Sequence, residues 1–290
     1  MPISRSRSGL FVYTTQSGTS NPKFKCSYSL DERIDSEVAQ LCWTLLRSIQ
    51  PYLGDQVNIS VRNHLGVVRE AFPDPVQSWV VYYAALILGA SDAALTLAVH
   101  NLGREERILA RQIFEYTFKA QYFATHPRQA KTELETEPFR ELWLLEDLGY
   151  DRRMARYRRL KTECLQLARK RPALYAHAKK TRRREPPSVP DSMGRKSRKR
   201  GATYGLHYRL RSQTMHGGVL GMREVFTAQG IQFDSRETDP NFTLADICRY
   251  LIAFLKIMNG VFSLGKAGEI DAFLNNVTRI ENRLFSHLKK

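Results

Sequence analysis

The sequence lacks the motifs of several common enzyme classes. It contains no G-x-x-x-x-G-K-[ST] or G-x-G-x-x-G string, no H-E-x-x-H string and no G-x-S-x-G string. These strings place phosphate-binding loops, zinc ligands and nucleophilic serines in their working geometry. Nucleotide hydrolysis, dinucleotide chemistry, zinc peptidase chemistry and serine hydrolysis therefore lose their usual support.

Cysteine is scarce, and its positions are scattered. The four cysteines are Cys26, Cys42, Cys164 and Cys248, with no C-x-x-C pair and no histidine at ligand spacing. Zinc sites and disulfide frameworks both need closely spaced or numerous cysteines. We expect ordinary, mostly buried thiols, and we predict neither a metal nor a cofactor.

A secretory signal and a long apolar run are also missing. Residues 1–8 are rich in Arg and Ser and lack an apolar core. The most apolar run is the 12 residues of 79–90, and Ser91 and Asp92 follow it. A membrane span needs about 20 apolar residues. We therefore predict a buried helix here, a cytoplasmic protein and no membrane partner.

The positive charge is concentrated in one stretch of the chain. The net charge is +16, and residues 151–212 hold 21 of the 45 Lys and Arg but 4 of the 29 Asp and Glu. The remaining residues, 24 basic and 25 acidic, nearly balance. A local basic block favours a polyanion partner, because neutralising phosphates releases counterions. RNA or another nucleic acid is the expected partner, although a solvated basic linker has the same composition.

Helical periodicity runs through the chain after residue 30, with almost no strand pattern beside it. We expect Ser36 and Thr243 to cap helices, Pro138 to break one and Gly89 to weaken one. A short hairpin can lie within residues 227–241. The expected helices cover residues 36–47, 58–72, 78–102, 104–124, 130–148, 152–179, 202–216, 243–264 and 266–288.

Short connections between long helices predict an all-α antiparallel helical bundle. Residues 1–29 are expected to form a flexible N-terminal arm. Residues 30–290 are expected to form a single helical domain, interrupted by a basic flexible loop at 181–201 that contains three prolines.

The segment Tyr204-Gly-Leu-His-Tyr-Arg-Leu-Arg-Ser-Gln-Thr-Met-His216 is the best candidate for chemistry. On a helix Arg209, Ser212 and His216 fall within about 60° of one another, whereas Arg211 lies roughly 140° from His216. Gly217 follows directly, so the helix dipole favours a charged imidazole on His216. A histidine that exchanges protons beside a fixed guanidinium suits phosphodiester cleavage without a metal.

This segment resembles the HEPN superfamily (higher eukaryotes and prokaryotes nucleotide-binding), in which an Arg-x₄₋₆-His pattern lies on a late helix. Two pairings with His216 fit, from Arg209 or from Arg211. The string Tyr208-Arg209-x-x-Ser212-x-x-x-His216 also looks like an uncharacterised bacterial helical family with that signature and an earlier Arg-x-x-x-Glu. Arg111-Gln-Ile-Phe-Glu115 matches the earlier motif, and the likeness covers about residues 60–265.

The resemblance implies a HEPN-like fold, a homodimer and a metal-independent ribonuclease centre. We therefore predict an endoribonuclease of a bacterial antiviral defence or toxin system, with catalytic residues Arg209, His216, Ser212 and Arg211, supported by Tyr208. Arg111 and Glu115 either support that centre or form a buried ion pair that fixes helix packing. Charge recruits RNA through Arg182, Arg183, Arg184, Arg195, Lys196, Arg198, Lys199 and Arg200.

Two other functions remain open at this stage. A non-catalytic nucleic-acid-binding protein needs the basic residues but not His216. A scaffold subunit uses the basic residues to meet an acidic partner protein of a multi-protein defence system. Substitution of His216 separates the first from the ribonuclease, and affinity for acidic protein identifies the second.

Overall fold

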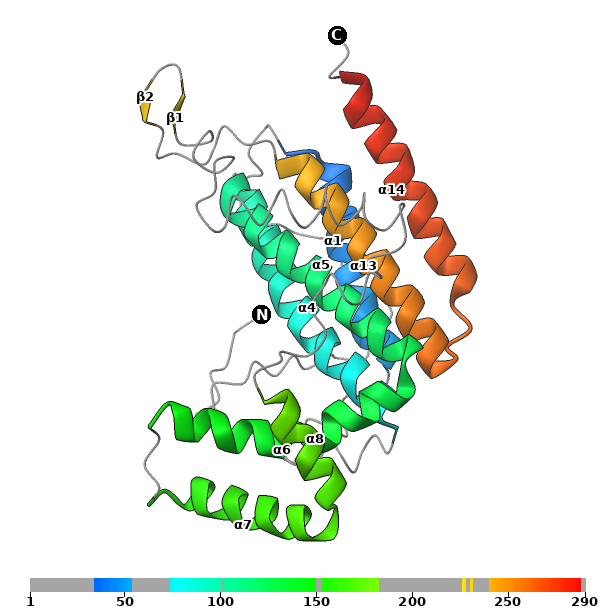
Figure 1. Cartoon of the computed structure of the whole chain (residues 1–290). Helices are drawn as coiled ribbons and strands as arrows, with labels where there is room; N and C mark the ends of the chain where they lie inside the picture. Colours follow the sequence, from blue (N-terminus) through cyan, green and yellow to red (C-terminus); the bar gives the residue numbers. More distant parts are fainter. Residues whose placement is uncertain are drawn as a thin grey trace, which may run out of the picture.

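The computed structural model describes residues 34–53, 74–100, 102–149, 153–182, 226–227, 230–231 and 240–287 (Figure 1). These residues form eight helices and one short hairpin. In the hairpin, strand β1 (Phe226–Thr227) pairs antiparallel with β2 (Gly230–Ile231). The all-α class is therefore confirmed. The expected arm at 1–29 and the expected helices at 58–72 and 202–216 lie outside the described residues.

Five helices pack lengthwise into what we call the five-helix bundle (Figure 1). They are α1 (Ser36–Leu53), α4 (Pro75–Val99), α5 (Gly103–Thr125), α13 (Pro240–Phe262) and α14 (Ala267–His287). Helix α5 packs against α4 and α13, while α1 lies against α13 and α4. Helix α14 covers α13 and α1 at the edge of the bundle.

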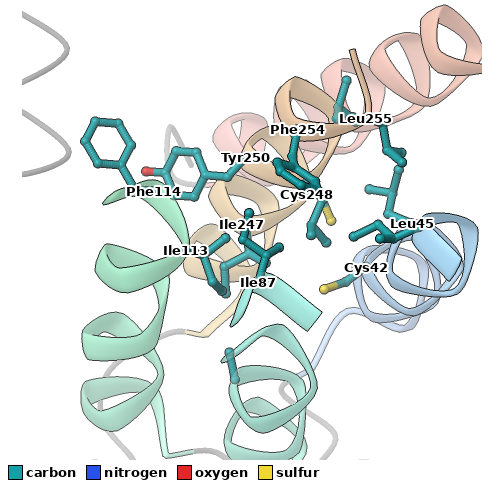
Figure 2. Close-up of a cluster of buried hydrophobic side chains, with 14 of the residues drawn as sticks. Cys42, Leu45, Ile87, Ile113, Phe114, Ile247, Cys248, Tyr250, Phe254 and Leu255 are labelled. Carbon is teal, nitrogen blue, oxygen red and sulfur yellow. The ribbon is translucent and has the colours of Figure 1, made fainter. Parts of the chain in front are cut away.

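Apolar side chains from all five helices form the core of the bundle, and Figure 2 shows a part of it. The ring of Phe114 meets the ring of Tyr250 edge-on, with centroids 5.2 Å apart, and so joins α5 to α13. Each buried Leu, Ile or Phe side chain stabilises the fold by about 1.5–3 kcal/mol relative to exposure. The residues labelled in Figure 2 are Cys42, Leu45, Ile87, Ile113, Phe114, Ile247, Cys248, Tyr250, Phe254 and Leu255.

Helix α4 is long and apolar enough to cross a membrane, judged by length and composition alone. The helix expected over 78–102 runs over Pro75–Val99, so it begins and ends three residues earlier. Eleven of those residues are buried, and the helix contacts α1, α5, α6 and α13. This packing favours a helix of the protein core over a helix that spans a membrane. The helix also continues through Gly89, so the expected weak point there was wrong.

The start of α1 is tied to α14 by charge. The Asp35 carboxylate accepts hydrogen bonds from the backbone N–H groups of Glu37 (2.9 Å) and Val38 (3.2 Å), so Asp35 and not Ser36 caps the helix. Arg283 of α14 bonds the same carboxylate, and Arg279 lies 3.1 Å from Glu37. The acidic first turn of α1 therefore meets two arginines.

Three further helices form a smaller body at one end of the bundle, which we call the three-helix unit (Figure 1). They are α6 (Pro127–Asp147), α7 (Ala155–Lys170) and α8 (Pro172–Thr181). The first turn of α6 joins the bundle, where the Trp79 indole donates a 3.0 Å hydrogen bond to the Ala130 carbonyl. The unit has its own core of Phe139, Leu142, Trp143, Tyr157, Leu160, Cys164, Leu174 and Ala178.

The single helix expected over residues 152–179 is divided in two. Pro172 occupies the first position of α8, where its missing N–H costs nothing. The residue before a proline is driven out of the helical region, and Arg171 has φ −138° and ψ 69°. The chain turns at Arg171, and this corner folds α8 back onto α6 and α7.

Two other helix expectations were wrong. Helix α6 continues through Pro138, whose side chain is buried in the unit and whose carbonyl accepts a hydrogen bond from the Cys164 thiol (3.3 Å). Helix α13 begins at Pro240, before the expected cap at Thr243, which is buried within the first turn. Proline suits the first helical position, and the sequence reading gave it too little weight.

Candidate nucleic-acid interface

The predicted catalytic centre lies outside the described residues. This holds for Tyr208, Arg209, Arg211, Ser212 and His216. It holds too for seven of the eight cations expected to recruit RNA, which are Arg183, Arg184, Arg195, Lys196, Arg198, Lys199 and Arg200. Three predicted site residues remain to be placed: Arg111, Glu115 and Arg182.

Arg111 and Glu115 lie one turn apart on α5, in different surroundings. Arg111 is 6% exposed, while Glu115 forms a 2.7 Å ion pair with Lys119 one turn further on. Burial first, and then the Glu115 carboxylate, raise the pKa of the neighbouring Tyr116 hydroxyl. A charged residue as buried as Arg111 is a functional or a packing element, and this geometry fits both.

The densest described cluster of positive charge is on α7 and α8. Residues 153–182 contain 11 Lys and Arg and a single acidic residue, Glu163. Helix α6, against which both helices pack, contains six acidic and three basic residues. The inner side of α7 and α8 therefore meets carboxylates.

Two arginines that flank α8 connect its ends to α6. Arg171 forms a 2.7 Å ion pair with Glu135, whose hydrogen bond and charge raise the pKa of Arg171. Arg182 lies 2.7 Å from Asp147, and its guanidinium carbon is 5.3 Å from the centre of the Trp143 ring. A predicted RNA-binding residue, Arg182, thus also connects the end of α8 to α6.

Helix α7 presents cations on the side opposite its buried residues. Tyr157, Leu160 and Cys164 face the core of the unit. At 100° per residue, Arg158 and Arg169 share one outward direction, and Arg159 and Lys170 share another about 100° away. All four side chains are exposed. Two short rows of positive charge therefore run along the outer side of α7.

Some of these cations also make local contacts. The Arg158 guanidinium donates two hydrogen bonds, of 3.0 and 2.6 Å, to the Arg153 carbonyl. Arg159 lies 3.0 Å from Glu163, but both side chains are more than half exposed, so their attraction is weak in water. Exposed guanidiniums of this kind are available to a stronger anion such as phosphate.

Helix α8 adds Lys179 and Lys180 in its last turn, both exposed. No ion pair is recorded for Arg169, Lys170, Lys179 or Lys180 with any other described residue. We call the outward cations the basic face, which comprises Arg158, Arg159, Arg169, Lys170, Lys179 and Lys180. These six cations on one small body can make several contacts to phosphates.

The rest of the described structure offers little for chemistry on a small molecule. An open groove of about 560 Å³ lies between α1 and α14. Arg279 and Glu37, which form an ion pair with each other, both line it. Among the described residues, no three His, Cys, Asp or Glu side chains gather in an arrangement that could hold a metal ion. The basic face is therefore the candidate site.

Comparison of the chain with protein-family models, with curated proteins and with solved structures gave no match. The function is therefore argued from the residues of this chain. Sequence reasoning drew attention to the cations of residues 151–212 but gave no role to Tyr175 and Trp143. The spacing of Arg171, Tyr175 and Lys179 at i, i+4 and i+8 was a signal that an aromatic shares one side of a basic helix.

Proposed function

We propose that the protein binds RNA through the basic face of α7 and α8. The observation that carries this proposal is the arrangement of charge within the three-helix unit. Arg171 and Arg182 pair with acidic residues of α6, while Lys179, Lys180 and the outer cations of α7 point into solvent. Because the acidic residues of α6 pair with Arg171 and Arg182, the remaining exposed cations are available to bind a ligand.

The expected ligand is a phosphate backbone, with sequence read weakly or not at all. Lysine and arginine contacts to phosphate supply affinity and register, whereas discrimination between sequences needs contacts to base edges. In the sequence, Arg183, Arg184 and the cations of residues 195–200 follow α8. Together they suit a nucleic-acid strand better than a single small anion.

A second candidate function is supported by the string from Tyr208 to His216. We propose that this segment cleaves the RNA that the basic face recruits, without a metal ion. In this scheme His216 removes the 2′-hydroxyl proton, the 2′-oxygen attacks phosphorus, and the 5′-oxygen leaves with the proton that the imidazolium of His216 returns. Arg209 offsets the charge on the phosphate. The products are a 2′,3′-cyclic phosphate and a 5′-hydroxyl.

The expectations that go beyond the all-α class stay with this second candidate. They are an antiparallel HEPN-like bundle, a homodimer, a cytoplasmic location and a role in bacterial defence or growth arrest. Arg111 is buried on α5, which suits a residue that positions catalytic groups as well as one that fixes packing.

Salt-dependent RNA binding tests the proposed function. Fluorescence anisotropy is measured with a labelled oligouridylate between about 50 and 200 mM salt, and each lost single-strand phosphate contact lowers the slope of log K by about 0.7. Lys179→Gln/Lys180→Gln is expected to lower affinity and slope. Arg128→Gln/Lys131→Gln is the matched control, because it removes two exposed cations from the start of α6.

The outcomes separate the candidates. Equal losses in both double variants mean that net charge alone drives association, and the basic face is then not a site. A wild-type protein that binds an acidic protein surface but no RNA or DNA supports the scaffold function instead. If the protein binds DNA as tightly as RNA, the basic face remains the interface, but its ligand is nucleic acid in general.

Cleavage is tested separately with end-labelled RNA in the presence of EDTA. The wild type is expected to cleave, leaving 2′,3′-cyclic phosphate ends, while His216→Ala and Arg209→Ala bind but do not cleave. Binding by all three proteins without cleavage excludes the ribonuclease for the isolated protein. The RNA-binding function would remain.

A further inference from the structure

One aromatic side chain lies exposed within the basic region. Tyr175 of α8 is 38% exposed, one turn after Arg171 and one turn before Lys179. At 100° per residue, Lys179 lies about 40° from Tyr175 around α8, while Arg171 and Arg182 flank the two ends of the helix. Single-strand binding surfaces combine exposed aromatic rings with positive charge.

The Tyr175 ring is held in place by the core of the unit. It meets the Phe139 ring edge-on with centroids 5.4 Å apart, and the Trp143 ring is tilted against it at 6.3 Å. The Tyr175 N–H also donates a 3.2 Å hydrogen bond to the Arg171 carbonyl, which fixes the first turn of α8. A ring supported in this way loses little conformational freedom when a ligand stacks on it.

Among the described residues, Lys179 supplies the unpaired positive charge one turn from the ring, because Arg171 and Arg182 pair with Glu135 and Asp147 of α6. The Arg182 guanidinium lies over Trp143, the same ring that contacts Tyr175. Lys179 is exposed, and no ion pair is recorded for it with any residue that the structure describes. A phosphate can therefore be held next to the ring while a base occupies it.

We propose that Tyr175 is a base-stacking platform that makes the basic face prefer single-stranded over double-stranded RNA. This inference rests on the proposed RNA-binding function and adds a specificity-determining residue to it. A duplex offers phosphates to the cations, but its bases stay stacked on one another. A single strand can place an unstacked base on the tyrosine ring, and base–aromatic stacking works for every base.

Helix α4 offers a matched control. Tyr82 is 51% exposed and rests on the rings of Trp79 (5.9 Å) and Tyr83 (5.3 Å), so it resembles Tyr175 in exposure and support. Helix α4 contains no Lys or Arg. A stacking site needs both a ring and nearby cations, and α4 supplies the ring without cations of its own.

The test compares three RNA probes of equal length, about 12 nucleotides, which is within the range of single-strand site sizes. They are oligouridylate, the same strand with abasic sugars and a duplex. The variants are Tyr175→Leu, which keeps apolar packing without a π face, Tyr175→Trp, which keeps the π face, and Tyr82→Leu. Duplex affinity and far-ultraviolet circular dichroism report whether each variant is folded.

We expect Tyr175→Leu to bind oligouridylate about 5- to 150-fold more weakly, the range covered by base–aromatic stacking. Its affinities for the abasic strand and the duplex should change by less than about twofold, because these two ligands use charge alone. Tyr175→Trp should retain the preference, and Tyr82→Leu should change nothing.

Equal losses for all three probes in Tyr175→Leu would assign the ring a structural role and overturn the inference while RNA binding stands. An unchanged affinity for oligouridylate would overturn it too. A wild type that binds none of the probes would remove the proposed function itself.

Discussion

The five-helix bundle and the three-helix unit distribute charge in opposite ways. The five helices of the bundle contain nine Lys and Arg and nine Asp and Glu, so they balance. Residues 153–182 of the unit contain 11 basic residues and one acidic residue. The bundle pairs its charges across helices, as Arg249 does with Glu281. In the unit, two cations pair with carboxylates of α6, and other cations are exposed to solvent.

The two regions also differ in the size of their apolar cores. The bundle buries side chains from all five of its helices, whereas the core of the unit contains eight buried residues. Because folding stability comes mainly from burial of apolar surface, the bundle carries most of the stability. The unit carries the excess charge. Substitutions should therefore separate stability from binding.

The largest expected effect is in the bundle core. Phe254→Ala of α13 should lower the free energy of unfolding by about 3–5 kcal/mol, because it removes a fully buried ring and leaves a cavity. Urea denaturation followed by circular dichroism measures this change. Lys256→Ala on the same helix is the control and should stay within about 0.5 kcal/mol. Equal effects would mean that α13 is not the centre of the core.

A smaller, local effect is expected in the unit. Leu174→Ala removes a buried side chain from α8, at a cost of about 2–5 kcal/mol to the unit. RNA affinity should fall while the unfolding transition of the bundle persists. The control is Leu165→Ala on α7, the same substitution at a site that is 52% exposed. A single transition that moves as a whole would show instead that the two regions unfold together.

Alkaline pH should weaken the unit through Cys164. Burial, followed by the nearby Glu163 carboxylate, raises the pKa of this thiol from 9.0 to about 11. A raised folded-state pKa adds stability that is complete below the unfolded value and is lost as pH rises through the folded one. The wild type should therefore lose stability relative to Cys164→Ala between pH 9 and 11. Parallel curves for the two proteins would contradict this.

The smallest effect concerns the surface pair Arg159–Glu163. Arg159→Gln should change the free energy of unfolding by less than about 0.5 kcal/mol, because exposed pairs one turn apart are weak. The same variant should lower RNA affinity, since Arg159 belongs to the basic face. If Arg159→Gln lowers stability but not RNA affinity, the role of Arg159 is to stabilise the fold.

The sequence predicted the helices of the bundle well, and their periodicity explains why. Helix α5 was expected at 104–124 and runs over Gly103–Thr125, because apolar residues repeat along it at helical spacing. Capping was predicted less well. Asp35 caps α1 while bound to Arg283, a partner 248 residues away that local sequence cannot reveal.

The three-helix unit was missed as a separate body. Pro138 was expected to break α6, but burial of Phe139 and Leu142 beside it outweighs the lost backbone hydrogen bond, which costs about 3 kcal/mol. The break at Pro172, by contrast, could have been predicted from the sequence. A proline keeps the residue before it, here Arg171, out of the helical conformation. The predicted centre at Tyr208–His216 stays a prediction.

Hydrogen–deuterium exchange with and without RNA tests the central claim most directly. The account predicts that RNA slows exchange in α7 and α8 and leaves α1, α13 and α14 unchanged, because the cations that meet phosphate lie on the three-helix unit. Protection confined to α1 and α14 would place the ligand at the groove between them. Unchanged exchange in α7 and α8 under saturating RNA would contradict the account.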